Sequence, residues 1–277
     1  MEKSLKLYLS LVCLIFMFSC KNETTNLNAA EKRQAAEARY KKAIFYTQGS
    51  TAFQNGIVEA LEIDPTYEQG VYELSVAHLK RGMPNKWLPQ YNKAVKMDSV
   101  SRIPWRGYLY LWFYRDYKKA IADFDASDTL TPNFIDAPQG HSVDYWRGIA
   151  YLGLNNHEKS NWYFEKHITK EAEDFGEDYV DLTAFLYNGI SYYEAGNYEK
   201  ALINFDKQLE YGKDLSADAK YYKAKIFKSQ DKIATAKTLI DSAIDNFNSG
   251  YYNNRAYVET LRQIYLEDLE AFKKELE

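Results

Sequence analysis

The chain has 277 residues, of which 46% are hydrophobic and 27% are charged, and its formal net charge is −4. This composition favours a folded protein over a disordered one. The small acidic charge leaves no broad basic face for phosphates, so nucleic acid is not an expected partner. Both cysteines, Cys13 and Cys20, lie within the first twenty residues, which excludes a disulfide framework or a cysteine metal site in the rest of the chain.

The first twenty residues have the pattern of an export signal. A short basic start precedes an apolar stretch over residues 5–18, which Lys6 interrupts early. The uninterrupted part is too short to span a bilayer but has the length of a signal-peptide core. A small residue and a cysteine, Ser19-Cys20, follow directly, and residues 21–28 are mostly polar.

This arrangement resembles a bacterial lipobox, although Met17 and Phe18 stand where that family usually has a leucine and a small residue. In the family, the cysteine is acylated and the peptide before it is removed. The resemblance implies a lipoprotein signal peptide over residues 1–19, lipidation of Cys20 and a flexible tether over residues 20–28. Several acyl chains together hold a protein stably on a membrane. An ordinary signal peptide or an uncleaved anchor is the alternative.

The remainder of the chain repeats itself. Residues 145–166 align without a gap with residues 186–207, and residues 116–124 match residues 197–205. Residues 59–65 and 91–98 have the composition of two further helix ends. The slots shared by the two longest segments include Gly148/Gly189, Ile149/Ile190, Tyr151/Tyr192, Asn156/Asn197 and Phe164/Phe205.

This pattern resembles the tetratricopeptide repeat. That repeat has a glycine and a tyrosine on a first helix, a short polar turn, and an alanine with a bulky apolar residue on a second helix. Repeat ends are placed at Pro65, Ser99, Pro132, Ala172, Lys213 and Asn248. Their spacings of 33 to 41 residues compare with 34 in the family. The resemblance implies an all-α solenoid over residues 29–250, a right-handed superhelix of about six helix pairs, because a single pair cannot bury its apolar faces alone.

Three segments depart from the repeat. Residues 131–143 and 170–179 lengthen two repeats, and the second of these segments is acidic. We interpret both as surface insertions, with loops that carry function as the alternative. Residues 251–277 are expected to form one C-terminal capping helix, with a helix that docks a partner as the alternative. Its apolar residues recur at spacings of four and three; they are Tyr257, Leu261, Tyr265, Leu269, Phe272 and Leu276.

The sequence offers no constellation for catalysis. It has no nucleophile motif between a strand and a helix, no glycine loop for a phosphate, and no closely spaced histidine pair for zinc. The four histidines are His78, His141, His157 and His167. We interpret them as ordinary helix and loop residues, and expect neither enzymatic activity nor a metal or cofactor.

The resemblance implies a binding surface instead. In tetratricopeptide arrays, the first helix of each repeat lines a concave groove. The groove-binding positions carried over to this sequence are Tyr72, Trp105, Trp112, Tyr145, Leu186, Tyr193 and Tyr221. Exposed aromatic side chains often dominate binding, although a position in the core is the alternative for several of them. The exposed ones are expected to be Trp105, Trp112, Tyr145 and Tyr193.

A lysine, asparagine and arginine clamp for a terminal carboxylate, known in part of the family, is absent. Its slots are mostly aromatic or aliphatic here, and only Lys225 and Lys228 lie nearby. We therefore expect a lipoprotein of the bacterial envelope, in the outer membrane, that binds a protein or peptide partner through this groove. The alternatives are a structural subunit of an outer-membrane assembly complex, because barrel-assembly machines include a tetratricopeptide lipoprotein, and a glycan-binding envelope protein.

Overall fold

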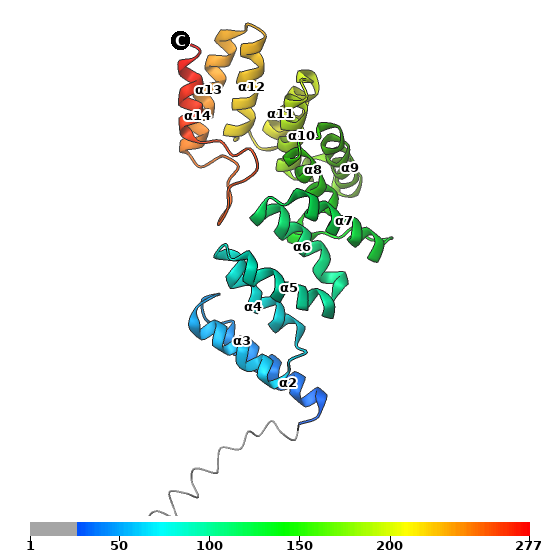
Figure 1. Ribbon diagram of the computed structural model, residues 1–277. Helices are drawn as coiled ribbons and strands as arrows, with labels where there is room; N and C mark the ends of the chain where they lie inside the picture. Colours follow the sequence, from blue (N-terminus) through cyan, green and yellow to red (C-terminus); the bar gives the residue numbers. More distant parts are fainter. Residues whose placement is uncertain (1–26) are drawn as a thin grey trace, which may run out of the picture. The chain divides into compact units, whose positions relative to one another are not determined.

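The computed structural model describes residues 27–277 (Figure 1). Within this range the chain forms thirteen α-helices and two short 3-10 helices, and no β-strand. It divides into two compact units, Met1–Met97 and Asp98–Glu277, here called unit 1 and unit 2. The predicted signal peptide (residues 1–19), the lipidation site Cys20 and most of the predicted tether lie outside the described residues. Among the described helices, none is long and apolar enough to cross a membrane.

Consecutive helices pack against each other in pairs. In unit 1 the pairs are α2 (Ala29–Ala43) with α3 (Thr51–Ile63), and α4 (Glu68–Lys80) with α5 (Pro84–Met97). In unit 2 they are α6 (Ser99–Tyr114) with α7 (Tyr117–Leu130), α8 (Val143–Gly153) with α9 (His157–Phe175), α10 (Leu182–Glu194) with α11 (Tyr198–Tyr211), and α12 (Ala217–Ser229) with α13 (Ile233–Asn248). The predicted all-α helical repeat is confirmed.

The glycine and phenylalanine slots of the repeat explain how closely the paired helices approach. Phe124, Phe164 and Phe205 on the second helices are completely buried. A methyl group added to the facing glycines, Gly107, Gly148 and Gly189, would lie 2.7, 2.8 and 2.6 Å from these rings. Only a residue without a side chain fits there, and the ring fills the space that the glycine leaves.

A substitution tests this close approach. Gly148→Ala is expected to lower the free energy of unfolding by about 1–3 kcal/mol, because the added methyl group overpacks the Phe164 ring. Urea unfolding followed by circular dichroism measures the change. The variant Gly148→Ala/Phe164→Leu is the control, because it removes the ring edge that the methyl group meets, and it should recover part of the loss. Wild-type stability for Gly148→Ala alone would show that the close approach is not required.

The polar slot of the repeat caps the second helices. Asp116, Asn156 and Asn197 directly precede α7, α9 and α11. Each side chain accepts a hydrogen bond from the backbone N–H three residues later, at 3.3, 3.1 and 3.2 Å. An oxygen at this position satisfies a donor that the first helical turn leaves without a partner. The three aligned turns therefore start their helices by the same contact.

Both insertions fold onto neighbouring parts of unit 2. The first contains η2 (Pro138–Gly140), whose Pro138 carbonyl accepts a hydrogen bond from Trp146 Nε1 at 2.9 Å. The second consists of the last turns of α9 and of η3 (Glu177–Tyr179). There the Glu177 carboxylate accepts a hydrogen bond from the Tyr211 hydroxyl at 2.7 Å and pairs with Lys207. The insertions thus cover surfaces of the repeats beside them.

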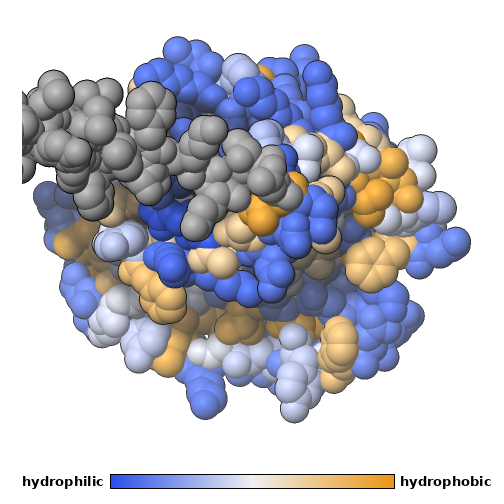
Figure 2. Space-filling model, turned by 90° about the horizontal axis from the view of Figure 1, so that it is seen from below, coloured by the Kyte–Doolittle hydropathy of each residue, from blue (hydrophilic) through white to orange (hydrophobic). Residues whose placement is uncertain are grey.

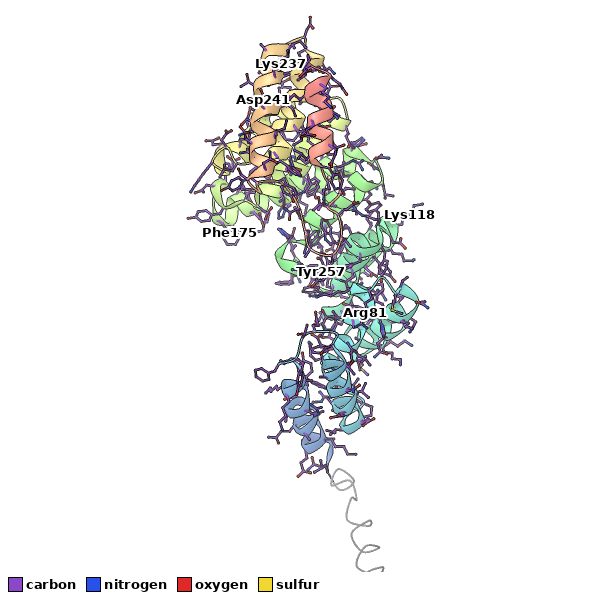
Figure 3. The ribbon with its side chains drawn as sticks, turned by 90° about the vertical axis from the view of Figure 1, so that its left-hand side faces the viewer. Arg81, Lys118, Phe175, Lys237, Asp241 and Tyr257 are labelled. Atoms are coloured by element: carbon purple, nitrogen blue, oxygen red, sulfur yellow. The ribbon has the colours of Figure 1, made fainter. Side chains whose placement is uncertain are left out.

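The prediction of one capping helix over residues 251–277 is wrong. Only α14 (Leu266–Lys274) is helical, and it packs on α13, which carries Asp241 (Figure 3). Lys273 on α14 pairs with Asp241 at 2.6 Å. Residues 252–264, here called the strap, are non-helical, and Tyr257 and Arg262 have positive φ angles of 75° and 57°. The strap is held by contacts to other helices, which override the helical spacing of its apolar residues.

Candidate functional site

The first helices of the pairs in unit 2, namely α6, α8, α10 and α12, carry six of the seven predicted groove residues. We call the surface that these helices share the first-helix face. The predicted residue Tyr72 lies on α4 of unit 1 and is half-buried. The half-buried residues on the first-helix face are Trp105, Tyr193 and Tyr221, and the buried ones are Trp112, Tyr145 and Leu186. The expectation that Trp112 and Tyr145 are exposed is wrong.

Tyr145 is covered by the first insertion and by the next repeat. The His141 ring stacks on it with 4.4 Å between the ring centroids. Its hydroxyl lies 2.7 Å from Thr183 Oγ1, at the start of α10. Only 3% of Tyr145 stays exposed, and burial holds the pKa of its hydroxyl well above the ordinary value. Tyr145 is therefore a core residue that joins two repeats.

Trp112 is covered by an arginine from the strap. The Arg255 guanidinium lies 4.8 Å from the Trp112 ring centroid, 5.3 Å from that of Tyr108 and 6.0 Å from that of Trp146. It also donates a hydrogen bond to the Tyr108 hydroxyl at 2.6 Å. Three aromatic rings around one cation form a favourable cage, because each ring presents negative charge on its face.

The strap contacts all four first helices. At its start, Asn253 donates from its side chain to the Tyr187 hydroxyl on α10 at 2.9 Å. Near its end, Arg262 holds the Glu194 carboxylate through two nitrogens at 2.6 and 2.9 Å. From the end of α6, Arg115 donates to the Glu259 carbonyl at 2.6 Å. Figure 1 shows this segment running between α13 and α14, along the first-helix face.

A buried carboxyl group lies beneath the strap. Asp218, on the first turn of α12, is 1% exposed and accepts a hydrogen bond from the Asn253 backbone N–H at 2.7 Å. Burial raises its pKa to about 7, because the charged form loses its hydration, and the hydrogen bond from Asn253 opposes this rise only in part.

An open pocket of about 540 Å³ lies at the first-helix face. The residues that line it come from α10, α12 and α14: Tyr193, Tyr221, Lys225, Lys228, Ser229, Asp268, Ala271, Phe272 and Glu275. The Lys225 ammonium lies 5.4 Å from the Tyr193 ring centroid and 5.1 Å from that of Tyr221. Burial raises the pKa of Tyr221 to about 12, so its hydroxyl stays neutral. Lys228 pairs with Glu275 at 2.6 Å.

The contribution of α14 to this pocket was missed from the sequence. Phe272 and Glu275 were assigned to a helix that covers the end of the array, whereas they form one wall of the pocket beside Tyr221. Their alternation of apolar and charged residues was visible, but the break in the helix before Leu266 was not. The pocket offers aromatic faces and a cation, which suit binding of a polypeptide.

Ser142, His167 and Glu171 lie in a row that resembles a hydrolytic triad. The Ser142 hydroxyl lies 3.0 Å from His167 Nδ1, and His167 Nε2 lies 3.3 Å from the Glu171 carboxylate. However, Ser142 Oγ already accepts the Tyr145 N–H as the cap of α8, and His167 is only 2% exposed. Burial lowers the pKa of His167 to about 4. We interpret the row as part of the core. Among residues 27–277, no group of three or more histidine, cysteine or acidic residues could hold a metal ion.

No protein-family model matches the sequence, and no curated protein does. Solved structures match over most of the chain. PilW, described as a widely conserved type IV pilus biogenesis factor, has a TM-score of 0.61 and 17% identity, covering 78% of this chain and 94% of PilW. PilF of Pseudomonas aeruginosa has a TM-score of 0.59 and 18% identity, with the same coverage of 78% and 94%.

YrrB, described as a TPR protein with an unusual peptide-binding site, has a TM-score of 0.50 and 19% identity, covering 69% of this chain and 91% of YrrB. The fold is that of tetratricopeptide-repeat proteins. At these identities the likeness concerns the fold alone, and the binding site of this chain has to be argued from its own residues.

Proposed function

We propose that this protein is a lipoprotein of the bacterial outer membrane that binds a polypeptide partner on the first-helix face of unit 2. One observation carries the binding part: this face already holds an extended stretch of polypeptide, the strap. Its backbone carbonyl at Glu259 and its side chains at Asn253, Arg255 and Arg262 all bind residues of the first helices or of the turns that follow them. The tetratricopeptide fold supports the same function.

No strap residue lines the open pocket, so this part of the first-helix face is available to a partner. Tyr193 and Tyr221 are half-buried, so a ligand can cover them further at a low cost in side-chain entropy. Lys225 lies over both rings, and Glu275, which pairs with Lys228, also interacts with its charge. We therefore place the partner across Tyr193, Tyr221 and Lys225.

The membrane anchor rests on the sequence pattern around Cys20. An apolar core of signal-peptide length is followed by Ser19-Cys20 and a polar stretch. Acyl chains on Cys20 would hold the protein at the membrane and so raise the local concentration of the binding surface for partners at the same membrane.

A pull-down from detergent-solubilised membranes tests the binding surface. Wild type is compared with Tyr193→Ala/Tyr221→Ala, and Trp162→Ala serves as the control because Trp162 is an exposed aromatic residue on α9, outside the open pocket. Circular dichroism first verifies that each variant is helical. We expect a partner that wild type and Trp162→Ala retain and that the double variant loses, with its affinity lowered at least about tenfold. Identical partners for all three proteins would contradict the proposed surface.

The same experiment addresses the two alternatives. A structural subunit of an assembly complex would co-purify with an integral membrane protein that stays bound to the double variant, because its contacts would extend beyond the pocket. A glycan-binding protein would retain no polypeptide at all. Because Trp112 and Tyr145 are buried, neither ring is available for a sugar to stack on.

A further inference from the structure

The turn between α2 and α3 in unit 1 exposes three consecutive large hydrophobic residues. Ile44, Phe45 and Tyr46, here called the apolar tip, are 45%, 90% and 54% exposed. The turn is nevertheless ordered by its own hydrogen bonds, from Tyr46 N to the Ala43 carbonyl at 3.0 Å and from Ser50 N to the Thr47 carbonyl at 2.9 Å. Buried Ala43 on one side and Phe53 on the other fix it to the core of unit 1. The tip is thus held outward by a rigid base.

Basic side chains surround the apolar tip. Lys41 and Lys42 are in the last turn of α2 and are exposed. Lys80 donates to the Gln48 side chain at 2.7 Å, and Arg81 donates to the Gly49 carbonyl at 2.7 Å (Figure 3). The Glu73 carboxylate also contacts the turn and accepts a hydrogen bond from Gln48 at 3.2 Å. Four cations therefore flank the tip on two sides.

Apolar residues with aromatic rings, surrounded by lysine and arginine, match the chemistry of a bilayer surface with anionic lipids. Phenylalanine and tyrosine enter the interface between headgroups and acyl chains, and lysine and arginine are attracted by the negative surface potential. Figure 2 shows one face of the molecule, on which hydrophobic residues lie among hydrophilic ones.

We propose that the apolar tip inserts into the surface of an anionic bilayer while Lys41, Lys42, Lys80 and Arg81 contact its headgroups. The geometry of the tether allows this contact, and this step rests on the proposed acylation of Cys20. The helix α2 separates the tip from the tether by fifteen residues, about 22 Å. Residues 21–28 span at most about 28 Å when extended, so the anchor and the tip can reach the same bilayer.

Site-specific labelling of the full acylated protein tests the contact. Because acylation consumes the Cys20 thiol and Cys13 lies in the peptide that is removed, Phe45→Cys introduces one reactive thiol for an environment-sensitive fluorophore. Glu62→Cys is the matched control, since it is exposed near the opposite end of α3. In vesicles that contain phosphatidylglycerol, we expect the label at position 45 to shift to shorter wavelength and to be quenched by spin-labelled lipid, and the label at position 62 to do neither.

The charges provide a second readout. An unacylated Cys20→Ser chain made without residues 1–19 and carrying Lys41→Gln/Lys42→Gln should bind phosphatidylglycerol vesicles about 30-fold more weakly than the same chain with both lysines, since each lysine near the surface contributes roughly fivefold. Vesicle flotation of the acylated protein separately reports the anchor. If the acylated protein floats but the label at position 45 stays in water, insertion of the apolar tip is contradicted and the anchor is not. Failure of the acylated protein to float with neutral vesicles, while Cys20→Ser still binds phosphatidylglycerol vesicles through its lysines, would contradict the anchor and leave the tip intact. A spectral shift of the same size without vesicles would mean that a second copy of the protein covers the tip, and would also contradict the proposal.

Discussion

Replacing Arg147 with methionine is expected to lower the free energy of unfolding by about 3 kcal/mol, because it leaves a buried carboxylate without its closest buried cation. Arg147 is 1% exposed and donates to Asp144 at 3.0 Å, and Asp144 is itself only 3% exposed. Lys166 still reaches Asp144 at 2.8 Å, which places the loss at the lower end of the usual range for a broken buried pair. Urea unfolding followed by circular dichroism measures it.

The remaining partners of Arg147 make the origin of this loss testable. Asp125 and Asp128 pair with the same guanidinium but have side chains that are 61% and 51% exposed, so water can solvate them when the arginine is removed. The variant Arg147→Met/Asp144→Leu removes both buried charges and should recover most of the stability. If the double variant is less stable than Arg147→Met alone, the buried pair is not the origin of the loss.

Asp218→Asn is expected to change how stability depends on pH. Burial raises the pKa of Asp218 from its ordinary value of 3.8 to about 7, so between these values the folded chain holds a proton that the unfolded chain has released. The contribution of Asp218 to stability therefore falls as the pH rises from 4 to 7. The asparagine carries no charge and keeps an acceptor for the Asn253 N–H. Its stability relative to wild type should rise by about 4 kcal/mol over this interval.

The contribution of His167 to stability has the opposite pH dependence. The comparison of wild type with Asp218→Asn has to separate the two contributions. Burial lowers the pKa of His167 from 6.5 to about 4, with a smaller effect from His141. Its contribution is complete above pH 6.5 and is lost as the pH falls toward 4. Wild type combines two opposing slopes, whereas Asp218→Asn lacks the one from Asp218 and keeps the one from His167. Urea titrations from pH 4 to 8 measure both, and parallel curves for wild type and variant would show that Asp218 is charged throughout.

The helix pairs could be predicted from the sequence because each repeat is fixed by local contacts that recur. Gly148 and Gly189 face Phe164 and Phe205 at the same spacing, and Asn197 caps its helix as Asn156 does. Each of these contacts joins residues that lie within one repeat. An alignment of the chain with itself therefore reveals them without further information.

The exposure of the candidate site could not be predicted in the same way. Trp112 is covered by Arg255 and Tyr145 by His141, and both covering residues lie in segments that have no counterpart in the repeat. The helical spacing over residues 257–276 also gave no sign of the positive φ angles at Tyr257 and Arg262. Tyr193 and Tyr221 share their pocket with α14, which forms its other wall. The sequence had instead placed α14 in one long helix over residues 251–277.

The strap also alters how unit 2 can fold. In a simple repeat array each pair of helices needs only its neighbours, so folding can begin anywhere and the ends can fray. Here Arg255 reaches Tyr108 across 147 residues of chain, and Arg115 reaches Glu259 across 144. Such distant contacts slow folding, because a long loop must close before they form. The aromatic cage around Arg255 is thus completed only after nearly all of the chain has been synthesised, and unit 2 should unfold as one cooperative block.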